Sequence, residues 1–179
     1  MKNTLVLGLL AATFSLPALA ELKAGDKAPL FNTPAAFAGK ELTYSLGDNL
    51  KKGPVVLYFY PAAFTKGCTI EARMFAEAVP DFAALGASVV GVSSDKIETL
   101  AKFSVSECSS KFAVVADTDQ KVMKAYDSVL LSKTNYASRT SYVISPEGKV
   151  IYAYTDLDPA QHVANSMAAL KSWKSAQVK

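Results

Sequence analysis

One uninterrupted apolar run constrains the fold of this chain most strongly. Val55-Val56-Leu57-Tyr58-Phe59-Tyr60 contains only β-forming or apolar residues and lies between Gly53-Pro54 and Pro61. Such a run predicts a strand that is buried on both faces, as in sheets with helices on either side. Similar runs follow at 88–93 and 112–115. Segments with helical spacing separate or follow them, so we expect helices at 68–84, 96–107 and 117–126.

Local residues set the expected limits and faces of these helices. Pro80 is expected to kink the first helix or end it early, because proline removes a backbone donor. Asp95 is a plausible N-cap for the second helix. The expected buried stripe of the first helix comprises Ile70, Phe75, Val79 and Phe82.

The C-terminal part has the pattern of a β-hairpin followed by a helix. Strands expected at 141–145 and 150–154 flank Pro146-Glu147-Gly148-Lys149, which has turn chemistry. The order β-α-β-α-β-α-β-β-α predicts an α/β fold with a mixed central sheet and helices on both faces. Its ending resembles that of the thioredoxin-like fold. The last helix begins near Pro159, and its expected buried face comprises Val163, Met167, Leu170 and Trp173.

Residues 1–20 have the pattern of a secretory signal peptide. Met1-Lys2-Asn3-Thr4 is a short basic start, an apolar stretch follows, and Ala18-Leu19-Ala20 precedes a polar residue. A membrane anchor is the alternative, but a serine and a proline interrupt a stretch already shorter than the roughly 20 apolar residues of a span. We therefore expect cleavage after residue 20, one domain over 21–179, and a periplasmic protein with no membrane segment left.

Composition excludes several classes of protein. Half of the 179 residues are hydrophobic, which suits a packed core and not a disordered chain. With 19 basic and 16 acidic side chains, the charge is too balanced to indicate nucleic-acid binding. One histidine, His162, and two well-separated cysteines form no pattern of metal ligands, so no metal is expected. In an oxidising compartment, two cysteines often form one structural disulfide.

The segment after the first central strand carries the clearest chemical signal. It contains Pro61, Thr65 and Cys68, and sites in open α/β sheets form at the carboxyl ends of strands. Cys68 falls in the first turn of the expected helix, where unpaired N–H groups and the helix dipole favour the nucleophilic thiolate. The Thr65 hydroxyl could bond the sulfur or a bound oxygen, and Thr65 could equally be an N-cap. Pro61 fixes the loop and could shield the sulfur from water.

Three motifs in this chain resemble those of the peroxiredoxin family. Pro61, Thr65 and Cys68 match the active-site pattern Pro-x-x-x-Thr/Ser-x-x-Cys. Gly25-Asp26-Lys27-Ala28-Pro29-Leu30-Phe31 resembles the opening Gly-x-x-Ala-Pro-x-Phe, with leucine in place of the usual acidic residue. Arg139-Thr140-Ser141-Tyr142-Val143-Ile144 resembles the strand that carries the family's active-site arginine. Within the family, the chain looks most like the bacterioferritin-comigratory-protein (PrxQ) class.

The resemblance implies a thiol peroxidase that needs no cofactor, whether metal, haem or flavin. A peroxide would bind between Thr65, Arg139 and the helix amides, and the Cys68 thiolate would attack the nearer oxygen to form a sulfenic acid. Arg139, the Thr65 hydroxyl and the Cys68 amide would stabilise the leaving oxygen. Glu71 would orient Arg139. Without the family pattern, Arg139 would be interpreted as an exposed charge at a strand edge.

The second cysteine departs from the family pattern. Many members of this class place a resolving cysteine five residues after the peroxidatic one, where this chain has Arg73. Cys108, near the end of the second expected helix or in the loop after it, is the remaining candidate. A buried spectator cysteine and a one-cysteine enzyme resolved by an external thiol are the alternatives. A disulfide would require a thioredoxin-like periplasmic reductant, and the class suggests a monomer.

Two other function classes are considered. A thioredoxin-like thiol-disulfide oxidoreductase usually carries Cys-x-x-Cys, whereas Glu71 stands at the second cysteine position here. A non-enzymatic exported protein would instead hold a structural Cys68–Cys108 disulfide, and its Cys68 would not react with peroxide. His162 is interpreted as a surface or structural histidine, and Tyr136 and Trp173 as packing residues.

Overall fold

The apolar run at residues 55–60 forms the middle of a mixed seven-stranded sheet. In the computed structural model, which describes residues 22–177, β3 (Val55–Phe59) is buried along its whole length. It pairs in parallel with β4 (Ser88–Ser93) and antiparallel with β6 (Thr140–Ile144). β5 (Ala113–Ala116) continues the parallel part beside β4. The strand order is β2-β1-β5-β4-β3-β6-β7, so the expected mixed sheet is confirmed.

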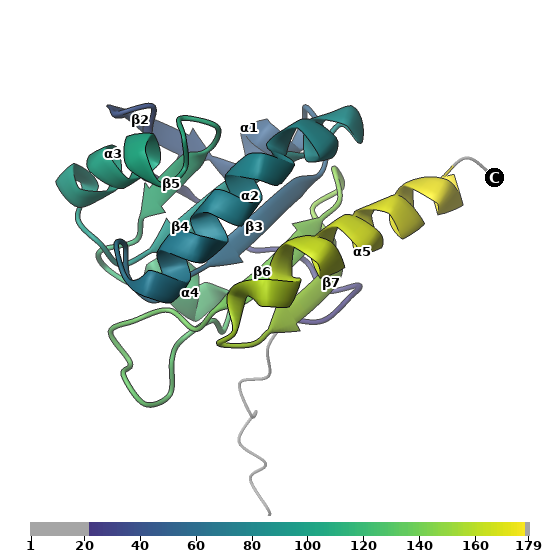
Figure 1. The fold of residues 1–179 in the computed structure, drawn as a ribbon. Helices are drawn as coiled ribbons and strands as arrows, with labels where there is room; N and C mark the ends of the chain where they lie inside the picture. Colours follow the sequence, from purple (N-terminus) through teal and green to yellow (C-terminus); the bar gives the residue numbers. More distant parts are fainter. Residues whose placement is uncertain (1–21, 178–179) are drawn as a thin grey trace, which may run out of the picture.

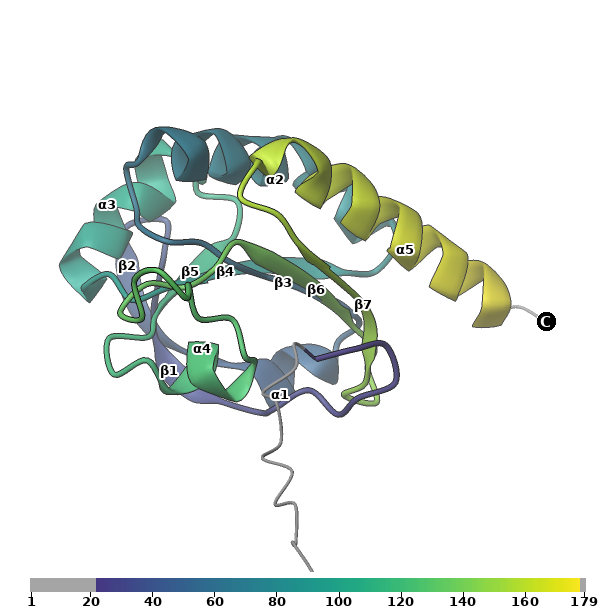
Figure 2. The ribbon, with the colours of Figure 1, turned by 90° about the horizontal axis from the view of Figure 1, so that it is seen from below.

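Helices cover both faces of this sheet (Figures 1 and 2). α2 (Lys66–Ala84), α3 (Ile97–Ser106) and α5 (His162–Gln177) lie on one face. α1 (Leu46–Leu50) and α4 (Lys121–Ala125) lie on the other. Two buried apolar clusters result, one on each side of the sheet. The expected helix cover on both faces is therefore confirmed.

The C-terminal hairpin and helix are also as predicted. β6 pairs antiparallel with β7 (Val150–Thr155), and a short 3₁₀ turn at Pro159–Gln161 leads into α5. Leu170 is completely buried in the core on the α2 side. The partly buried residues that pack against the same core include Val163, Met167 and Trp173.

The expected stripe of α2 was wrong at Ile70, and the expected break at Pro80 does not occur. Ile70 is 42% exposed, because the buried face of α2 passes through Cys68, Ala72 and Phe75 instead. The helix continues through Pro80 to its end four residues later. Pro80 itself lies on the exposed face of the helix, so its ring does not displace core side chains.

Asp95 is not the N-cap of α3, which is Lys96. The Asp95 carboxylate instead accepts hydrogen bonds from Ser93 Oγ at 2.8 Å and from the Ala63 N–H at 2.7 Å. Its position after β4 therefore serves the neighbouring loop rather than the helix that follows it.

The helix expected at 117–126 is shorter, spanning only α4. The buried Asp117 accepts hydrogen bonds from the N–H groups of Val122 at 3.0 Å and Met123 at 2.8 Å, so its carboxylate replaces a first turn.

The sequence pattern also missed the antiparallel hairpin of β1 (Asn32–Phe37) and β2 (Lys40–Ser45). β2 forms an edge of the sheet and is largely exposed, so it lacks the apolar run that marks the central strands.

The expected signal peptide, residues 1–20, lies outside the described residues. Between residues 22 and 177, no helix is both long and apolar enough to cross a membrane.

Candidate active site

The loop between β3 and α2 places Cys68 in the first turn of α2, as predicted. Cys68 is the third residue of the helix, and the Thr69 N–H donates to the Thr65 carbonyl at 2.9 Å to close that turn. The first N–H groups of an α-helix have no partner within it, so they and the helix dipole favour an anion at this position. The Cys68 side chain is only 1% exposed, which protects the sulfur from bulk solvent.

The loop before α2 is held in one shape by several contacts. Phe64 has the left-handed backbone conformation, φ 63°, which non-glycine residues adopt only at a local cost. Its ring packs edge-to-face with the ring of Phe103, with 5.2 Å between the ring centroids. The neighbouring Ala63 N–H donates a hydrogen bond to the Asp95 carboxylate. These contacts offset the cost of the turn. Pro61 begins the loop and is half-buried.

Thr65 is the N-cap residue of α2, but its side chain does not cap the helix. Its hydroxyl donates to the Ala62 carbonyl at 2.9 Å, and Thr65 is exposed to solvent. Because the Thr65 hydroxyl donates its proton within the loop, its oxygen lone pairs can still accept a hydrogen bond from another donor. The N-cap position is therefore confirmed without the expected capping bond.

Arg139 lies against Cys68 and is not an exposed strand-edge charge. It immediately precedes β6, is only 4% exposed, and its Nη2 lies 3.5 Å from Cys68 Sγ. Its Nε donates to the Leu157 carbonyl at 2.9 Å, and its Nη1 pairs with Glu71 Oε2. Burial acts to lower the pKa of Arg139, but Glu71 and Cys68 outweigh it, and the pKa is raised. The guanidinium is a fixed cation beside the sulfur.

Gly67 is a site residue that the sequence reasoning missed. A β-carbon at this position would lie 3.0 Å from Arg139 Nη2, closer than nearly all real contacts of this kind. A side chain here would push the guanidinium away from Cys68. The only sequence signal was a glycine directly before Cys68, inside a motif that does not specify it.

Glu71 joins the site from the second turn of α2. It is completely buried, and its Oε2 atom is the partner of Arg139. Burial raises the pKa of Glu71 to about 8, although the contact with Arg139 acts in the opposite direction. Its other oxygen, Oε1, lies 3.7 Å from His162 Nδ1. Sequence reasoning placed His162 on the surface or in a structural role, and the structure buries it completely behind Glu71.

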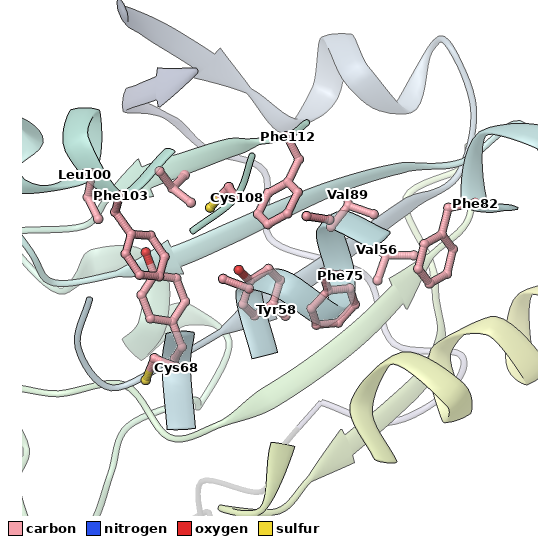
Figure 3. Close-up of a cluster of buried hydrophobic side chains, with 14 of the residues drawn as sticks. Val56, Tyr58, Cys68, Phe75, Phe82, Val89, Leu100, Phe103, Cys108 and Phe112 are labelled. Carbon is pink, nitrogen blue, oxygen red and sulfur yellow. The ribbon is translucent and has the colours of Figure 1, made fainter. Parts of the chain in front are cut away.

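Cys108 lies two residues after the end of α3, in the region expected from the sequence. Both cysteines are free thiols and belong to the same buried cluster, which Figure 3 shows with Cys108 among Tyr58, Phe103 and Phe112. Burial, assisted by the nearby Glu107 charge, raises the pKa of the Cys108 thiol well above its usual value. Cys108 is therefore held as a neutral thiol, unlike a cysteine at a helix N-terminus.

The residue before Cys108 connects this segment to α2. Glu107 Oε2 lies 2.9 Å from Arg73 Nε and 2.8 Å from Arg73 Nη2. Arg73 therefore touches the segment that carries the second cysteine. Within residues 22–177, no three His, Cys, Asp or Glu side chains are grouped as metal ligands.

Residues 24–153 match the AhpC/TSA family. The chain belongs to this family. Peroxiredoxin Bcp of Xanthomonas campestris is 34% identical over 173 residues, which cover 93% of this chain and 95% of that protein. Peroxidoxin BcpB of Mycobacterium tuberculosis has a similar structure, with a TM-score of 0.76, 32% identity, and coverage of 84% of this chain and 97% of that one. Peroxiredoxin Q of X. campestris gives a TM-score of 0.69 at 29% identity, over 79% and 90% of the two chains.

These comparisons decide between the function classes left open by the sequence. The chain is a peroxiredoxin, a thiol-dependent peroxidase with a thioredoxin-like α/β fold, and its relatives support the Bcp/PrxQ class. A thiol-disulfide oxidoreductase and a non-enzymatic protein with a structural disulfide are set aside.

Proposed function

We propose that this AhpC/TSA-family member is an exported peroxidase that reduces hydrogen peroxide, and organic hydroperoxides as well, through Cys68. The observation that carries the proposal is the fixed Arg139 cation 3.5 Å from a buried cysteine sulfur at a helix N-terminus. A cation and unpaired N–H groups both favour the thiolate, which is the form that attacks peroxide.

The geometry supports a specific division of roles. The Cys68 thiolate attacks the nearer peroxide oxygen, the O–O bond breaks, and the products are Cys68 sulfenic acid and an alkoxide or hydroxide that takes a proton from water. Arg139 and the Cys68 amide stabilise the charge that develops on the leaving oxygen, and the Thr65 hydroxyl joins them once it turns its proton away from the Ala62 carbonyl. Glu71 orients Arg139, and Pro61 holds the loop against the sulfur. No cofactor takes part, because sulfur supplies the electrons.

Cys108 is the proposed resolving cysteine. Its thiol would attack the Cys68 sulfenic acid, forming a Cys68–Cys108 disulfide and releasing water. The contact between Arg73 and Glu107 supports this role. Position 73 is where many members of the PrxQ class, which this chain resembles, carry their resolving cysteine. In this chain Arg73 contacts Glu107, the residue next to Cys108. Cys108 therefore neighbours a position from which, in those proteins, a thiol reaches the peroxidatic sulfur.

The disulfide requires both segments to rearrange. A disulfide needs Cα atoms within about 7 Å, and Figure 3 shows the two buried thiols at separate places in the packed cluster. We expect the start of α2 and residues 104–110 to unwind on oxidation. Ser109 and Ser110 both have left-handed backbone, φ 50° and 54°, which makes this segment a ready place for such a change. Equal hydrogen-exchange protection of both segments in reduced and oxidised protein would contradict this expectation.

Export, reductant and oligomeric state complete the proposal. Residues 1–20 have a signal-peptide pattern, which supports a periplasmic mature protein over 21–179. Its disulfide would be reduced by a thioredoxin-like periplasmic dithiol, and the protein would act as a monomer. N-terminal sequencing of protein from the periplasm tests the export, and sedimentation tests the monomeric state.

The chemical proposal is tested by thiol counting and intact mass after adding about one equivalent of hydrogen peroxide. Wild type, Cys68→Ser and Cys108→Ser are compared. We expect rapid loss of both thiols in wild type, no reaction in Cys68→Ser, and a trapped sulfenic acid in Cys108→Ser. A sulfenic acid without a disulfide in wild type would make Cys108 a spectator. A Cys68 that reacts no faster than a free thiol would refute the assigned role of Cys68.

A further inference from the structure

Asp95 is a charged residue beside the active-site loop, and no step proposed above uses it. It lies two residues after β4, and its Oδ2 atom accepts two hydrogen bonds, from the Ala63 N–H at 2.7 Å and from Ser93 Oγ at 2.8 Å. Ser93 is completely buried, and its carbonyl accepts from the Asp117 N–H at 2.8 Å. The carboxylate is therefore anchored to the sheet and reaches from there into the loop that precedes Cys68.

The hydrogen bond from Ala63 to Asp95 has the length of a charge-assisted bond. At 2.7 Å it lies at the short end of the range for an N–H group and an ionised acceptor, and such bonds are roughly twice as strong as bonds between neutral groups. Asp95 forms no ion pair within residues 22–177. Its negative charge therefore acts on the groups that donate to it.

The peptide group between Ala62 and Ala63 connects Asp95 to Thr65. Its N–H donates to Asp95, and its carbonyl oxygen accepts from Thr65 Oγ1 at 2.9 Å. No peptide bond between residues 22 and 177 is cis, so the N–H and the C=O of this group point in opposite directions. Asp95 and Thr65 therefore hold the same peptide group from opposite sides. The left-handed backbone of Phe64 turns the chain between them.

Two hydrogen bonds on one peptide group strengthen each other. An anion that accepts from the N–H polarises the group and leaves more negative charge on its carbonyl oxygen. The Ala62 carbonyl is thereby a better acceptor for the Thr65 hydroxyl. The hydroxyl proton is held within the loop, and the lone pairs of Oγ1 stay free at an exposed position three residues before Cys68.

We propose that Asp95 is a positioning residue of the peroxidase site. Through the shared peptide group, it keeps the Thr65 hydroxyl turned so that its lone pairs accept from the O–H group that hydrogen peroxide and organic hydroperoxides carry. This inference rests on the function proposed above. Only as charge develops on the leaving oxygen does the Thr65 proton turn away from the loop. Asp95 thus sets the resting orientation of a hydroxyl that acts first as an acceptor and then as a donor.

Two reactions of reduced Cys68 test this role, one with hydrogen peroxide and one with methyl methanethiosulfonate, which has no O–H or N–H group. Asp95→Ala should lower the rate constant with peroxide by about tenfold, the effect of one hydrogen bond, and leave the thiosulfonate reaction unchanged. Asp95→Asn keeps an oxygen acceptor and should lose only about threefold, because a bond between neutral groups is roughly half as strong.

The matched control is Glu98→Gln, which removes an exposed carboxylate from the first turn of α3. Both of its rate constants should equal those of wild type. Equal losses in the peroxide and thiosulfonate reactions of Asp95→Ala would mean that Asp95 only supports the fold around the sulfur, and this result would overturn the proposal.

Thr65→Val tests the route from Asp95 to the substrate. Valine has the shape of threonine without its hydroxyl, so in this background Asp95→Ala should change the rate constant with peroxide by less than about twofold. A second tenfold loss in the double variant would show that Asp95 acts without Thr65 and would overturn the proposal.

NMR of reduced protein labelled with ¹⁵N and ¹³C reports on the shared peptide group without peroxide, and it uses the milder variant in case Asp95→Ala does not fold. Asp95→Asn should move the Ala63 amide proton upfield, because its charge-assisted bond weakens, and should also move the Ala62 carbonyl carbon. Glu98→Gln should move neither signal. An Ala62 carbonyl signal that is the same in wild type and Asp95→Asn would refute the polarisation of this peptide group.

The wild-type rate separates this inference from the proposed function. If wild-type Cys68 reacts with peroxide no faster than free cysteine, the proposed function falls and the inference falls with it. If wild type is fast and Asp95→Ala is equally fast, only the role of Asp95 is overturned.

Discussion

Replacing Arg139 should damage both stability and peroxide reduction, and a second substitution should restore only the stability. In Arg139→Met, Glu71 keeps a buried carboxyl group without its cation. Arg139 is 4% exposed and Glu71 is not exposed at all, so solvent does not screen the pair. Breaking a fully ionised buried pair costs about 3–5 kcal/mol of folding free energy, and this loss is expected above about pH 8, where Glu71 is ionised.

The same substitution removes a donor that lies 3.5 Å from Cys68 Sγ. Loss of one fixed donor to a developing negative charge typically lowers a rate by about 10²–10³. We therefore expect a fall of that size in the second-order rate constant with hydrogen peroxide, measured by stopped flow.

The double variant Glu71→Met/Arg139→Met separates the two effects. Replacing a whole buried ion pair with apolar side chains is often neutral for stability. The free energy of unfolding, measured in urea, should return to near the wild-type value, while the rate constant with hydrogen peroxide stays low. Arg73→Met is the matched control, since its ion pair is at the surface, with Arg73 59% exposed, and is worth about 0–1 kcal/mol. A double variant that regains peroxidase activity, or an Arg139→Met protein as fast as wild type, would refute the reasoning.

Three further outcomes follow from the structure. Arg73→Met and Glu107→Gln each remove the ion pair that holds the segment next to Cys108. After a peroxide pulse, disulfide formation should become faster, while the rate of sulfenic acid formation stays unchanged. Slower disulfide formation would argue against a restraining role for this ion pair. Phe103→Ala should lower the free energy of unfolding by about 3–5 kcal/mol in urea titrations, because the buried ring packs on Tyr60 at 5.6 Å and on Phe64; a loss below 1 kcal/mol would mean that the cluster refills the space. Because the folded-state pKa of Glu71 is raised from 4.5 to about 8, its protonation stabilises the fold fully below about pH 4.5, and this contribution is lost as pH rises through 8. From pH 5 to pH 8, the free energy of unfolding should therefore decrease more in wild type than in Glu71→Gln. An equal decrease in the two proteins would contradict the raised pKa of Glu71.

The central part of the fold could be predicted because its strands are buried on both faces. The run at 55–60 and the strand at 88–93 read as apolar without alternation, and the hairpin around residues 146–149 has strong turn chemistry. The β1–β2 hairpin could not be read in this way. Its outer strand, β2, lies at the sheet edge and is mostly exposed, so burial leaves no apolar run in the sequence.

The site was predictable where a motif fixed it and not where tertiary contacts did. Cys68 in the first turn of α2 follows from local sequence. Arg139 came only from the family resemblance, since its contact with Glu71 joins residues 68 positions apart. Asp95 looked like a helix cap, yet its carboxylate is turned to the loop around Ala63, because a free N–H there competes for it. Nothing local to His162 indicated that it lies behind Glu71.

The most direct test of this account is the second-order rate constant of reduced Cys68 with hydrogen peroxide, compared with that of a free cysteine at the same pH. A thiolate held at a helix N-terminus beside Arg139 should react faster than the free thiol by at least about a hundredfold, since fixed donors stabilise the leaving oxygen. Cys68→Ser should abolish the reaction. A rate equal to that of free cysteine would contradict the assignment of this site as the place of peroxide reduction.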